Sequence, residues 1–295
     1  MLKKSFFGTD GIRGSVINGE IEPEFVLKLG ITIGLVLKNY FSEPNVVLGK
    51  DTRSSGDMLE CALISGMVKT GVDVVCAGKI STPAIAFLTK SLRFSLGIVI
   101  SASHNSFHDN GFKFFDSNGN KLSNYFENEI EKVFNSKFKN LKSINFGKKS
   151  DLVDAKGRYI EFCKSSFPPN LNQKNLKIVL DSANGASCGL LGLVFKELGS
   201  NVIEVANSPN GENINEGVGS MHPHNLSKLV LKNNADFGVA LDGDGDRFIM
   251  SDKSGRIYNG DELLFAITKE KINKLGISKV NGVVGTLMSN LGLEK

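Results

Sequence analysis

Two stretches of the sequence repeat one order of strand, polar loop and helix, and this repeat constrains the fold more than any other feature. The first stretch runs from NVVLGKDTRSSG (45–56) to SLGIVISASHN (95–105), and the second runs from LKIVLDSANGAS (176–187) to DFGVALDGDGDR (236–247). Short β-branched runs that end in small or polar residues and lead into amphipathic stretches are typical of βα units. The repeat therefore predicts an α/β protein with two consecutive domains. Each should have a mixed, mostly parallel sheet that binds ligands at the carboxyl ends of its strands.

A third copy of the same design begins near the end of the sequence. The segment NGVVGTLMSNLG (281–292) again has the pattern of a strand followed by small polar residues that open a helix. A single strand cannot bury its own apolar face, so we expect this part to be poorly ordered or to pack elsewhere. The predicted domains are therefore 1–152 and 153–255, followed by an incomplete third domain, 256–295. The lysine-rich segment 137–150 is the predicted connector between the first two.

Composition limits the classes of protein to which this chain can belong. Its 295 residues are 41% hydrophobic, which is enough for one or two ordinary cores. The formal charge of +4 is too small and too scattered to indicate a nucleic acid or a membrane surface as partner. The cysteines have no C-x-x-C spacing, and no apolar run approaches the roughly 18 residues of a membrane helix. We therefore expect a soluble, cytoplasmic protein with reduced thiols.

The segment LDGDGDR (241–247) places three aspartates on alternate positions. In extended backbone, residues two apart point the same way, so Asp242, Asp244 and Asp246 can converge on one point. Carboxylates so close together repel each other unless a cation lies between them, and an oxygen-only ligand set suits magnesium better than zinc. The acidic loop therefore predicts a Mg²⁺ site with open positions for phosphate oxygens.

Two alternatives to a magnesium loop fit the sequence less well. An EF-hand would need Gly where Arg247 stands and Glu where Lys253 stands. A solvated turn explains one Asp-Gly pair better than it explains this run after an apolar strand. Arg247 is also a suitable bidentate partner for a phosphate.

A second polar cluster lies in GIVISASHNSFHDNGFKFF (97–115), a strand that runs into a loop. Ser103 and His104 are sequence neighbours, which is poor geometry for a hydroxyl and its activating base, so a hydrolase triad is not supported. A serine at the carboxyl end of a strand can instead carry a phosphoryl group if cations such as Lys113 and a metal ion meet its charge. Composition alone leaves a plain loop as an equal alternative.

A third cluster, FGTDGIRG (7–14), carries Arg13 beside an Asp-Gly turn, and a simple hairpin would explain it equally well. The three clusters together, in this order, resemble the α-D-phosphohexomutase family. The resemblance covers essentially the whole chain and is nearest to the bacterial members that act on glucosamine phosphates. The stretches that carry it, besides 7–14, are GKDTRSSG (49–56), GIVISASHN (97–105), DNGFKFF (109–115), GRYIEFCK (157–164), ANGA (183–186), NINEGVG (213–219), DGDGDR (242–247) and GTLMSN (285–290).

The resemblance implies an intramolecular phosphotransferase that interconverts glucosamine 6-phosphate and glucosamine 1-phosphate, in UDP-N-acetylglucosamine synthesis. Ser103 would carry the transferable phosphate, and a sugar 1,6-bisphosphate would be the intermediate and activator. The ligands that the resemblance implies for one Mg²⁺ are an oxygen of phosphorylated Ser103 and the carboxylates of Asp242, Asp244 and Asp246. The groups that it implies around the transferring phosphate are His104, Lys113, Arg13 and Arg247.

Departures from the family pattern leave alternatives open. Ser106 stands where proline usually follows the S-H-N motif, which removes a restraint on Asn105 and predicts a looser loop. The family's third and fourth domains carry loops that bind the sugar hydroxyls and the second phosphate, and neither motif is found here. One alternative is therefore an inactive or split form that needs a complementing carboxyl-terminal fragment, or a homodimer. Glucose or mannose phosphates remain alternative substrates, because the family's enzymes for these sugars share the same loops.

A different mechanism would make Asp242 a covalent nucleophile and Asp244 its acid and base. Phosphatases that resemble haloacid dehalogenases place such a D-x-D pair after a strand. This alternative leaves the Ser103 loop and Arg13 without a role.

Overall fold

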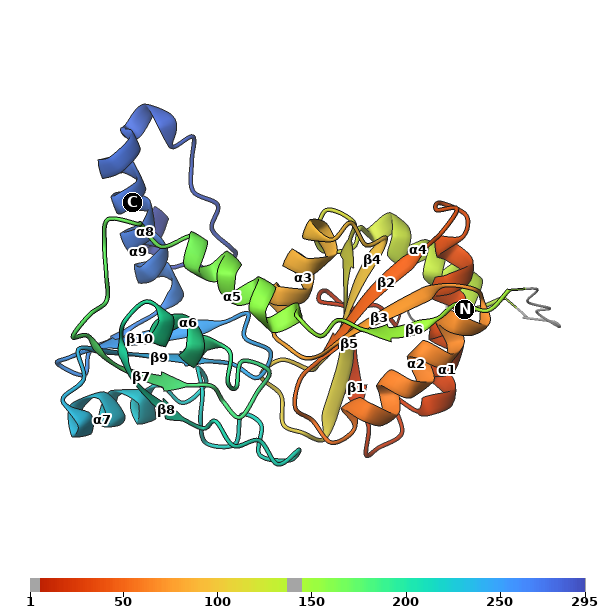
Figure 1. Ribbon diagram of the computed structural model, residues 1–295, viewed down its shortest axis with the longest axis horizontal. Coiled ribbons are helices and arrows are strands. Elements are labelled where there is room, and N and C mark those ends of the chain that lie inside the picture. The colour runs from red at the N-terminus through yellow and green to blue at the C-terminus, as the bar shows by residue number, and fades with distance from the viewer. Residues whose placement is uncertain (1–5, 137–144, 295) are drawn as a thin grey trace.

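The computed structural model describes residues 6–136 and 145–294, and in it the chain forms two α/β units that lie side by side (Figure 1). Residues 137–144 of the predicted connector lie outside the described part. The predicted boundary after residue 152 stays a prediction, and it falls between the last strand of the first sheet and the helix that follows it. No α-helix in the described part of the chain has the length and apolar character of a membrane span.

The first unit contains a mixed six-stranded sheet in the order β1-β5-β4-β2-β3-β6. Its strands are β1 (Ile12–Ser15), β2 (Asn45–Lys50), β3 (Asp73–Lys79), β4 (Leu96–Ile100), β5 (Asp109–Asp116) and β6 (Lys149–Asp151). The strand β2 is parallel to β3 and β4, and β3 is parallel to β6. The strand β5 is antiparallel to both β4 and β1.

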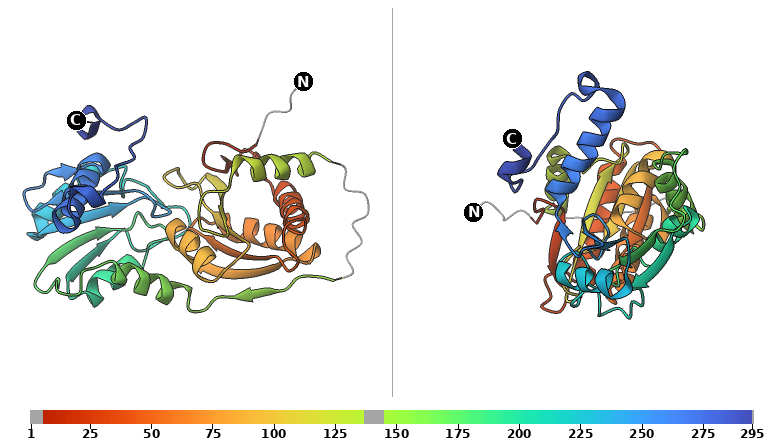
Figure 2. Two further views of the ribbon diagram at one scale, coloured as in Figure 1. Left: turned by 90° about the horizontal axis from the view of Figure 1, so that it is seen from above. Right: turned by 90° about the vertical axis from the view of Figure 1, so that its left-hand side faces the viewer.

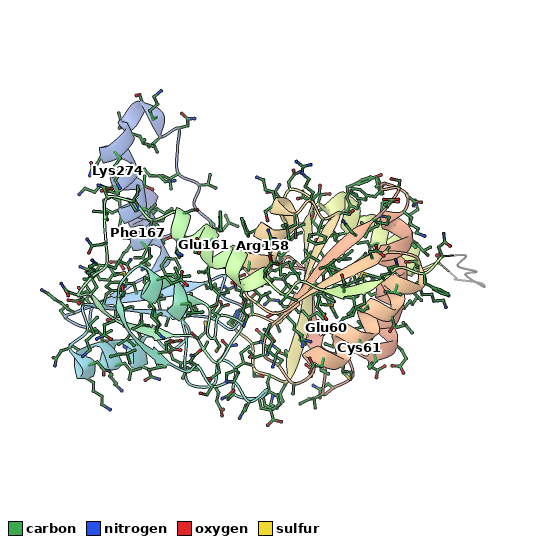
Figure 3. All side chains as sticks on the ribbon, viewed as in Figure 1. Glu60, Cys61, Arg158, Glu161, Phe167 and Lys274 are labelled. Carbon is green, nitrogen blue, oxygen red and sulfur yellow. The ribbon has the colours of Figure 1, made fainter. Side chains whose placement is uncertain are left out.

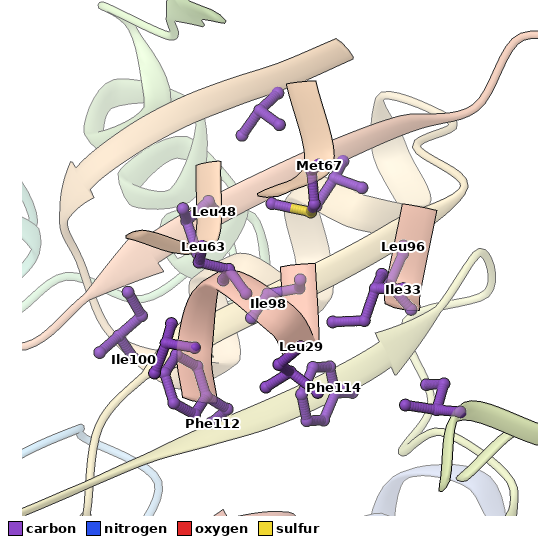
Figure 4. Packing of buried hydrophobic residues seen from close by; sticks show 14 of the residues in the cluster. Leu29, Ile33, Leu48, Leu63, Met67, Leu96, Ile98, Ile100, Phe112 and Phe114 are labelled. Carbon is purple, nitrogen blue, oxygen red and sulfur yellow. The ribbon is translucent and has the colours of Figure 1, made fainter. Parts of the chain in front are cut away.

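Helices cover both faces of this sheet because the strands are apolar on both faces. The helices are α1 (Pro23–Leu37), α2 (Gly56–Lys69), α3 (Thr82–Ser91) and α4 (Asn124–Phe134). Val46 and Leu48 pack in the core with α1, α2 and α4, whereas Val47, between them, packs with α3 on the other face. Figure 4 shows Leu63 of α2 and Phe112 of β5 in the larger core. Burying each such side chain completely contributes about 1.5–3 kcal/mol to the free energy of unfolding.

The second unit repeats the strand order of the first. Its sheet has the order β11-β10-β9-β7-β8. The strands are β7 (Lys177–Asp181), β8 (Asn201–Val205), β9 (Phe237–Leu241), β10 (Phe248–Asp252) and β11 (Ile257–Tyr258). The strand β7 is parallel to β8 and β9, and β10 is antiparallel to β9. The order β10-β9-β7-β8 thus matches β5-β4-β2-β3, which confirms the predicted α/β class with two consecutive mixed sheets.

Apolar packing joins the two units. The helix α5 (Ala155–Ser165) follows β6 and lies between the units in Figure 1. Its Ile160 packs in one cluster with Ala84 and Leu88 of α3 and with Val194 of α6 (Leu191–Glu197). On the second sheet, α7 (Pro223–Asn233) packs against β7 and β9 through a separate cluster. The shared cluster therefore packs the first sheet and α3 against α5 and α6.

The last described segment stands away from the second sheet, as the right view of Figure 2 shows. It contains α8 (Gly260–Leu275), the short helix η1 (Ile277–Lys279) and α9 (Leu291–Glu294). No residue of α8 is buried in the described structure, and Lys274, labelled in Figure 3, lies on its projecting end. The strand predicted at the start of 281–292 is wrong for this structure: residues 281–285 are irregular. A strand needs a neighbouring strand for its backbone hydrogen bonds, and none of the described strands pairs there.

Candidate active site

The two polar loops occupy matching positions in the two repeats and meet. The Ser103 loop (residues 101–106) lies in the connection between β4 and β5, and the acidic loop (residues 242–247) joins β9 to β10. The Ser103 hydroxyl donates a hydrogen bond of 2.6 Å to Oδ2 of Asp242. Both residues are fully buried. Two groups that lie 139 positions apart in the sequence therefore share one enclosed site.

The acidic loop folds back on the carboxylate of Asp242. Its Oδ1 accepts hydrogen bonds from the backbone amides of Gly245, at 3.1 Å, and Arg247, at 3.2 Å. Gly245 has φ of 73°, a left-handed conformation that favours glycine, which explains the glycine at this turn. The ligand atoms of Asp242, Asp244 and Asp246 lie within 4.8 Å of one another, so the three carboxylates converge.

Lys113 of β5 is the nearest cation to this cluster. Its Nζ lies 2.8 Å from Oδ2 of Asp244 and 2.6 Å from Oδ2 of Asp246. Asp10, in the amino-terminal loop, lies 3.4 Å from the same nitrogen. Burial disfavours the charge on Lys113, but the two carboxylates outweigh it and raise its pKa. Lys113 therefore remains a cation at neutral pH.

The pKa values of Asp242 and Asp244 are shifted in opposite directions. Burial, together with the charge of Asp244, raises the pKa of Asp242 to about 6, although the Ser103 hydroxyl opposes the shift. Burial acts in the same direction on Asp244, but the charge and the hydrogen bond of Lys113 are stronger and lower its pKa. At neutral pH the site therefore holds an ionised Asp244 and an Asp242 that titrates close to the working range.

The donor set of the acidic loop suits a hard divalent cation. Oδ1 of Asp244 is buried and has no hydrogen-bond partner in the described part of the chain. A buried carboxylate oxygen without a partner is costly, and a cation would satisfy it. Three convergent carboxylates offer only oxygen ligands, which Mg²⁺ prefers. The residues present therefore fit a magnesium ion.

His104 lies beside the Ser103 hydroxyl. Its Nδ1 is 3.4 Å from Oγ of Ser103. Burial, followed by the charges of Arg247 and Arg13, lowers the pKa of the imidazole. His104 is therefore neutral at pH 7 and can accept a proton.

The two arginines lie at the rim of the site. Arg247 follows the last aspartate and is exposed. Arg13 donates to Asp10 over 2.6 Å, and its Nε is buried without a partner among the described residues. Arg13 also borders a cavity of about 280 Å³ formed by residues 6–11 and 13. Both guanidinium groups thus keep donors that a ligand at the rim can use.

Three further residues, to which the sequence alone assigned no role, shape the site. Thr82 donates its hydroxyl to Oδ2 of Asp244 over 2.5 Å. Arg53 and Asn215 both donate to the backbone carbonyl of Ser103. The sequence contained signals for all three, because Thr82 begins a helix in a Ser-Thr-Pro run and the other two lie in motifs of the resemblance.

Comparison with known proteins places the two units in one family. The model of phosphoglucomutase/phosphomannomutase α/β/α domain I matches residues 4–141, and the model of α/β/α domain II matches residues 157–255. A solved structure of a phosphoglucomutase/phosphomannomutase family protein from Burkholderia thailandensis superposes with a TM-score of 0.79 at 27% identity. The match covers 93% of this chain and 60% of that chain.

Curated relatives named phosphoglucosamine mutase are similar over almost the whole chain. The relative from Polaromonas naphthalenivorans is 50% identical over 293 residues, and the relative from Burkholderia lata is 51% identical over 298. The matches cover 99% of this chain and 66% of each relative, so the chain spans slightly less than two thirds of their length. The chain belongs to the phosphoglucomutase/phosphomannomutase family.

Proposed function

We propose that this chain provides the phosphoserine and the metal site of a phosphoglucosamine mutase. The reaction interconverts glucosamine 6-phosphate and glucosamine 1-phosphate through glucosamine 1,6-bisphosphate. The observation that carries the proposal is the 2.6 Å hydrogen bond from Ser103 to Asp242, which supports a shared site for the serine and the acidic loop. The names of relatives about half identical to this chain support the choice of sugar.

Phosphorylated Ser103 is the phosphoryl donor in the first half of the reaction. The free hydroxyl of the sugar phosphate attacks phosphorus, a new bond to the sugar oxygen forms, and the bond to Oγ of Ser103 breaks. The proton of the sugar hydroxyl ends on Oγ, so atoms and charge balance. The bisphosphate then turns around, and the other phosphate returns to the serine by the reverse path.

His104 is the better of two candidates for moving this proton. Lys113 is held between Asp244 and Asp246, whose charges outweigh its burial and raise its pKa, so it keeps its proton. The pKa of His104 is lowered by burial and by both arginines, so the imidazole is free to accept a proton. Nδ1 of His104 is 3.4 Å from the serine oxygen that must receive it.

Positive charge around the transferring phosphate lowers the barrier, because phosphoryl transfer depends on positioning and on charge stabilisation. Mg²⁺ bound by Asp242, Asp244 and Asp246 would supply part of that charge. Lys113 holds Asp244 and Asp246 in place. Arg13 and Arg247 meet the phosphate oxygens from the rim.

Mass spectrometry tests the proposal directly. The chain is incubated with Mg²⁺ and glucosamine 1,6-bisphosphate, and its intact mass and phosphopeptides are measured. We expect one phosphate on Ser103 and none on the Ser103→Ala variant. A wild-type chain that takes up no phosphate would refute the proposal, and faster uptake from glucose 1,6-bisphosphate would change the assigned sugar.

Turnover needs a separate test, because the relatives are longer than this chain. The mutase reaction is measured with the chain alone and after addition of the carboxyl-terminal third of the Burkholderia lata relative. Turnover that requires the added polypeptide would support the complementing-fragment alternative. Full turnover by the chain alone would exclude it.

A further inference from the structure

We propose that Arg53 and Asn215 are positioning residues that hold the Ser103 loop from both sides of the site. They fix Ser103 in the backbone conformation that directs its hydroxyl at Asp242. This inference rests on the proposed function, because the position of the hydroxyl matters for activity only if Ser103 carries the phosphate.

Ser103 has a backbone conformation that needs external support. Its φ is 53°, in the left-handed region that residues other than glycine rarely adopt. Such a conformation costs about 1–3 kcal/mol and persists only when surrounding contacts enforce it. One contact comes from within the loop, where the amide of Ser103 donates to Oγ of Ser101 over 2.9 Å. The carbonyl side of the residue is held from outside the loop.

Arg53 holds the loop from the first unit. Its Nη2 donates to the carbonyls of Ser103, at 3.0 Å, and Asn105, at 2.9 Å, and its Nη1 donates to the carbonyl of Ser106. The side chain is completely buried, and its Nε pairs with Oδ2 of Asp51 at 2.9 Å. A planar guanidinium with five donors can bind three carbonyls and a carboxylate at once.

Asn215 holds the same loop from the second unit. It lies between β8 and α7, and its Nδ2 donates to the carbonyls of Ser103 and Asn105, both at 2.9 Å. Asn215 itself has a left-handed backbone conformation, with φ of 61°. Its backbone N–H donates to the carbonyl of Ala183 over 2.9 Å. Its side chain is therefore anchored on the second unit and reaches into the first.

The two side chains converge on the same pair of carbonyl oxygens. A carbonyl oxygen has two lone pairs, so Ser103 and Asn105 can each accept from Arg53 and from Asn215. Removing one donor leaves the other in place but frees the loop on one side. The arrangement also links the two units at the serine, since a shift of the second unit would move Asn215 together with the acidic loop.

The hydrogen bonds from Arg53 and Asn215 to the Ser103 loop also act where the S-H-N motif lacks its usual proline. Ser106 lacks the ring that would restrict Asn105, and the sequence therefore predicted a looser loop. In this structure the carbonyls of Asn105 and Ser106 both accept from Arg53, and that of Asn105 also accepts from Asn215. These hydrogen bonds restrain the backbone at the point where the proline ring is lacking.

Hydrogen exchange of the whole chain, without substrate, tests whether the hydrogen bonds from Arg53 and Asn215 restrain the Ser103 loop. In the variant Asn215→Gly, the new residue tolerates the positive φ, and the side-chain carboxamide that donates to the loop is removed. We expect the amides of residues 103–106 to exchange about tenfold faster, because the loop then opens locally. Asn234→Gly is the matched control, since Asn234 is exposed at the end of α7 and has φ of 49°.

Phosphorylation kinetics provide a readout that a general loss of stability would not imitate. In Asn215→Gly, we expect the maximal rate of Ser103 phosphorylation to fall about 100-fold, because a small displacement of a reacting atom is costly. The half-saturating bisphosphate concentration should change less than twofold. Arg53→Lys keeps the positive charge beside Asp51 but loses the planar guanidinium that reaches several carbonyls at once. We therefore expect the maximal rate of Ser103 phosphorylation to fall about 100-fold in this variant too, so that the conserved charge alone does not restore the rate.

The outcomes separate this inference from the proposed function. Unchanged exchange at residues 103–106 in Asn215→Gly, or equal changes in Asn234→Gly, would overturn the inference. A normal phosphorylation rate in Asn215→Gly would also overturn it. A wild-type chain that takes up no phosphate refutes the proposed function instead. The exchange experiment then still decides whether Asn215 restrains the Ser103 loop.

Discussion

Thr82 and Asp244 are joined by two hydrogen bonds between the units, although 162 positions separate them. The hydroxyl of Thr82 donates to Oδ2 of Asp244 over 2.5 Å, and its backbone amide donates to the carbonyl of the same residue over 2.8 Å. Thr82 is the first residue of α3, so the positive end of the helix dipole faces the carboxylate. The first unit thus stabilises a buried charge that belongs to the second.

Replacing Thr82 with valine should destabilise the chain. Valine has nearly the same shape but no hydroxyl, so Asp244 loses one donor while it remains buried. Because a hydrogen bond to a charged group is worth about 1.5–3 kcal/mol, we expect a loss of that size in the free energy of unfolding. Urea unfolding measures it, and Thr82→Ser, which keeps the hydroxyl, should lose less than half as much. Equal midpoints for Thr82→Val and the wild type would contradict this account.

Local pattern was sufficient to predict the two sheets. Val46, Val47 and Leu48 form a short apolar run between Asn45 and Gly49, which is typical of a strand buried on both faces. The same pattern recurs in 176–187 and 236–247, so the sequence predicted the repeat and placed both polar loops at the ends of strands. The strand predicted in 281–292 failed, because a strand depends on a neighbour that local pattern cannot supply.

Contacts within the site could be predicted only in part. The convergence of Asp242, Asp244 and Asp246 was predicted from their alternate spacing on extended backbone, but in the structure it comes from a turn at Gly245. Their contact with Ser103 follows from how two separate sheets pack. The left-handed conformation of Ser103 has no local signal, since a serine gives no indication of a positive φ. Asn215 lies in a motif of the resemblance, but its role was missed because its partners lie 110 and 112 positions away.

Binding of Mg²⁺ should weaken as the pH falls below about 6. The pKa of Asp242 is raised to about 6, mainly by burial, so a proton competes with the metal ion below that value. In the metal-free chain, the stability that comes from protonated Asp242 is fully present below the ordinary aspartate pKa and is lost as the pH rises through about 6. Stabilisation by Mg²⁺ should therefore increase over the same range.

Calorimetry at several pH values measures this competition. We expect the apparent dissociation constant of Mg²⁺ to rise roughly tenfold for each pH unit below about 6, because one proton is displaced per ion. In Asp242→Asn the side chain at this position cannot titrate, so the affinity of the variant for Mg²⁺ should be weak and nearly independent of pH. A wild-type affinity that is constant between about pH 5 and pH 7 would show that Asp242 does not titrate in this way.

Removing the side chain of Arg247 should affect chemistry and leave stability unchanged. The residue is exposed, and substitutions at exposed positions usually change the free energy of unfolding by no more than about 0.5 kcal/mol. We propose that this guanidinium stabilises the transferring phosphate, so its loss in Arg247→Ala should slow Ser103 phosphorylation by about 100-fold. Quenched-flow mass spectrometry gives the rate. Lys253→Ala removes an equal, exposed charge just after β10 and should react like the wild type.

Substituting Gly185 should displace the acidic loop. A Cβ atom at this position would lie 2.2 Å from the backbone oxygen of Gly243, which stands between Asp242 and Asp244. Backbone cannot move aside as a flexible side chain can, so Gly185→Ala should cost about 1–3 kcal/mol and weaken Mg²⁺ binding. The control is Gly157→Ala in α5, where a Cβ would meet nothing within 4 Å.

The control should move stability in the opposite direction, because alanine favours a helix by up to about 1 kcal/mol over glycine. Gly157→Ala should therefore unfold at a slightly higher urea concentration than the wild type and bind Mg²⁺ with unchanged affinity. Gly185→Ala should unfold earlier and bind the ion more weakly. If both variants bound Mg²⁺ like the wild type, the close approach of Gly185 to Gly243 would not determine the position of the acidic loop.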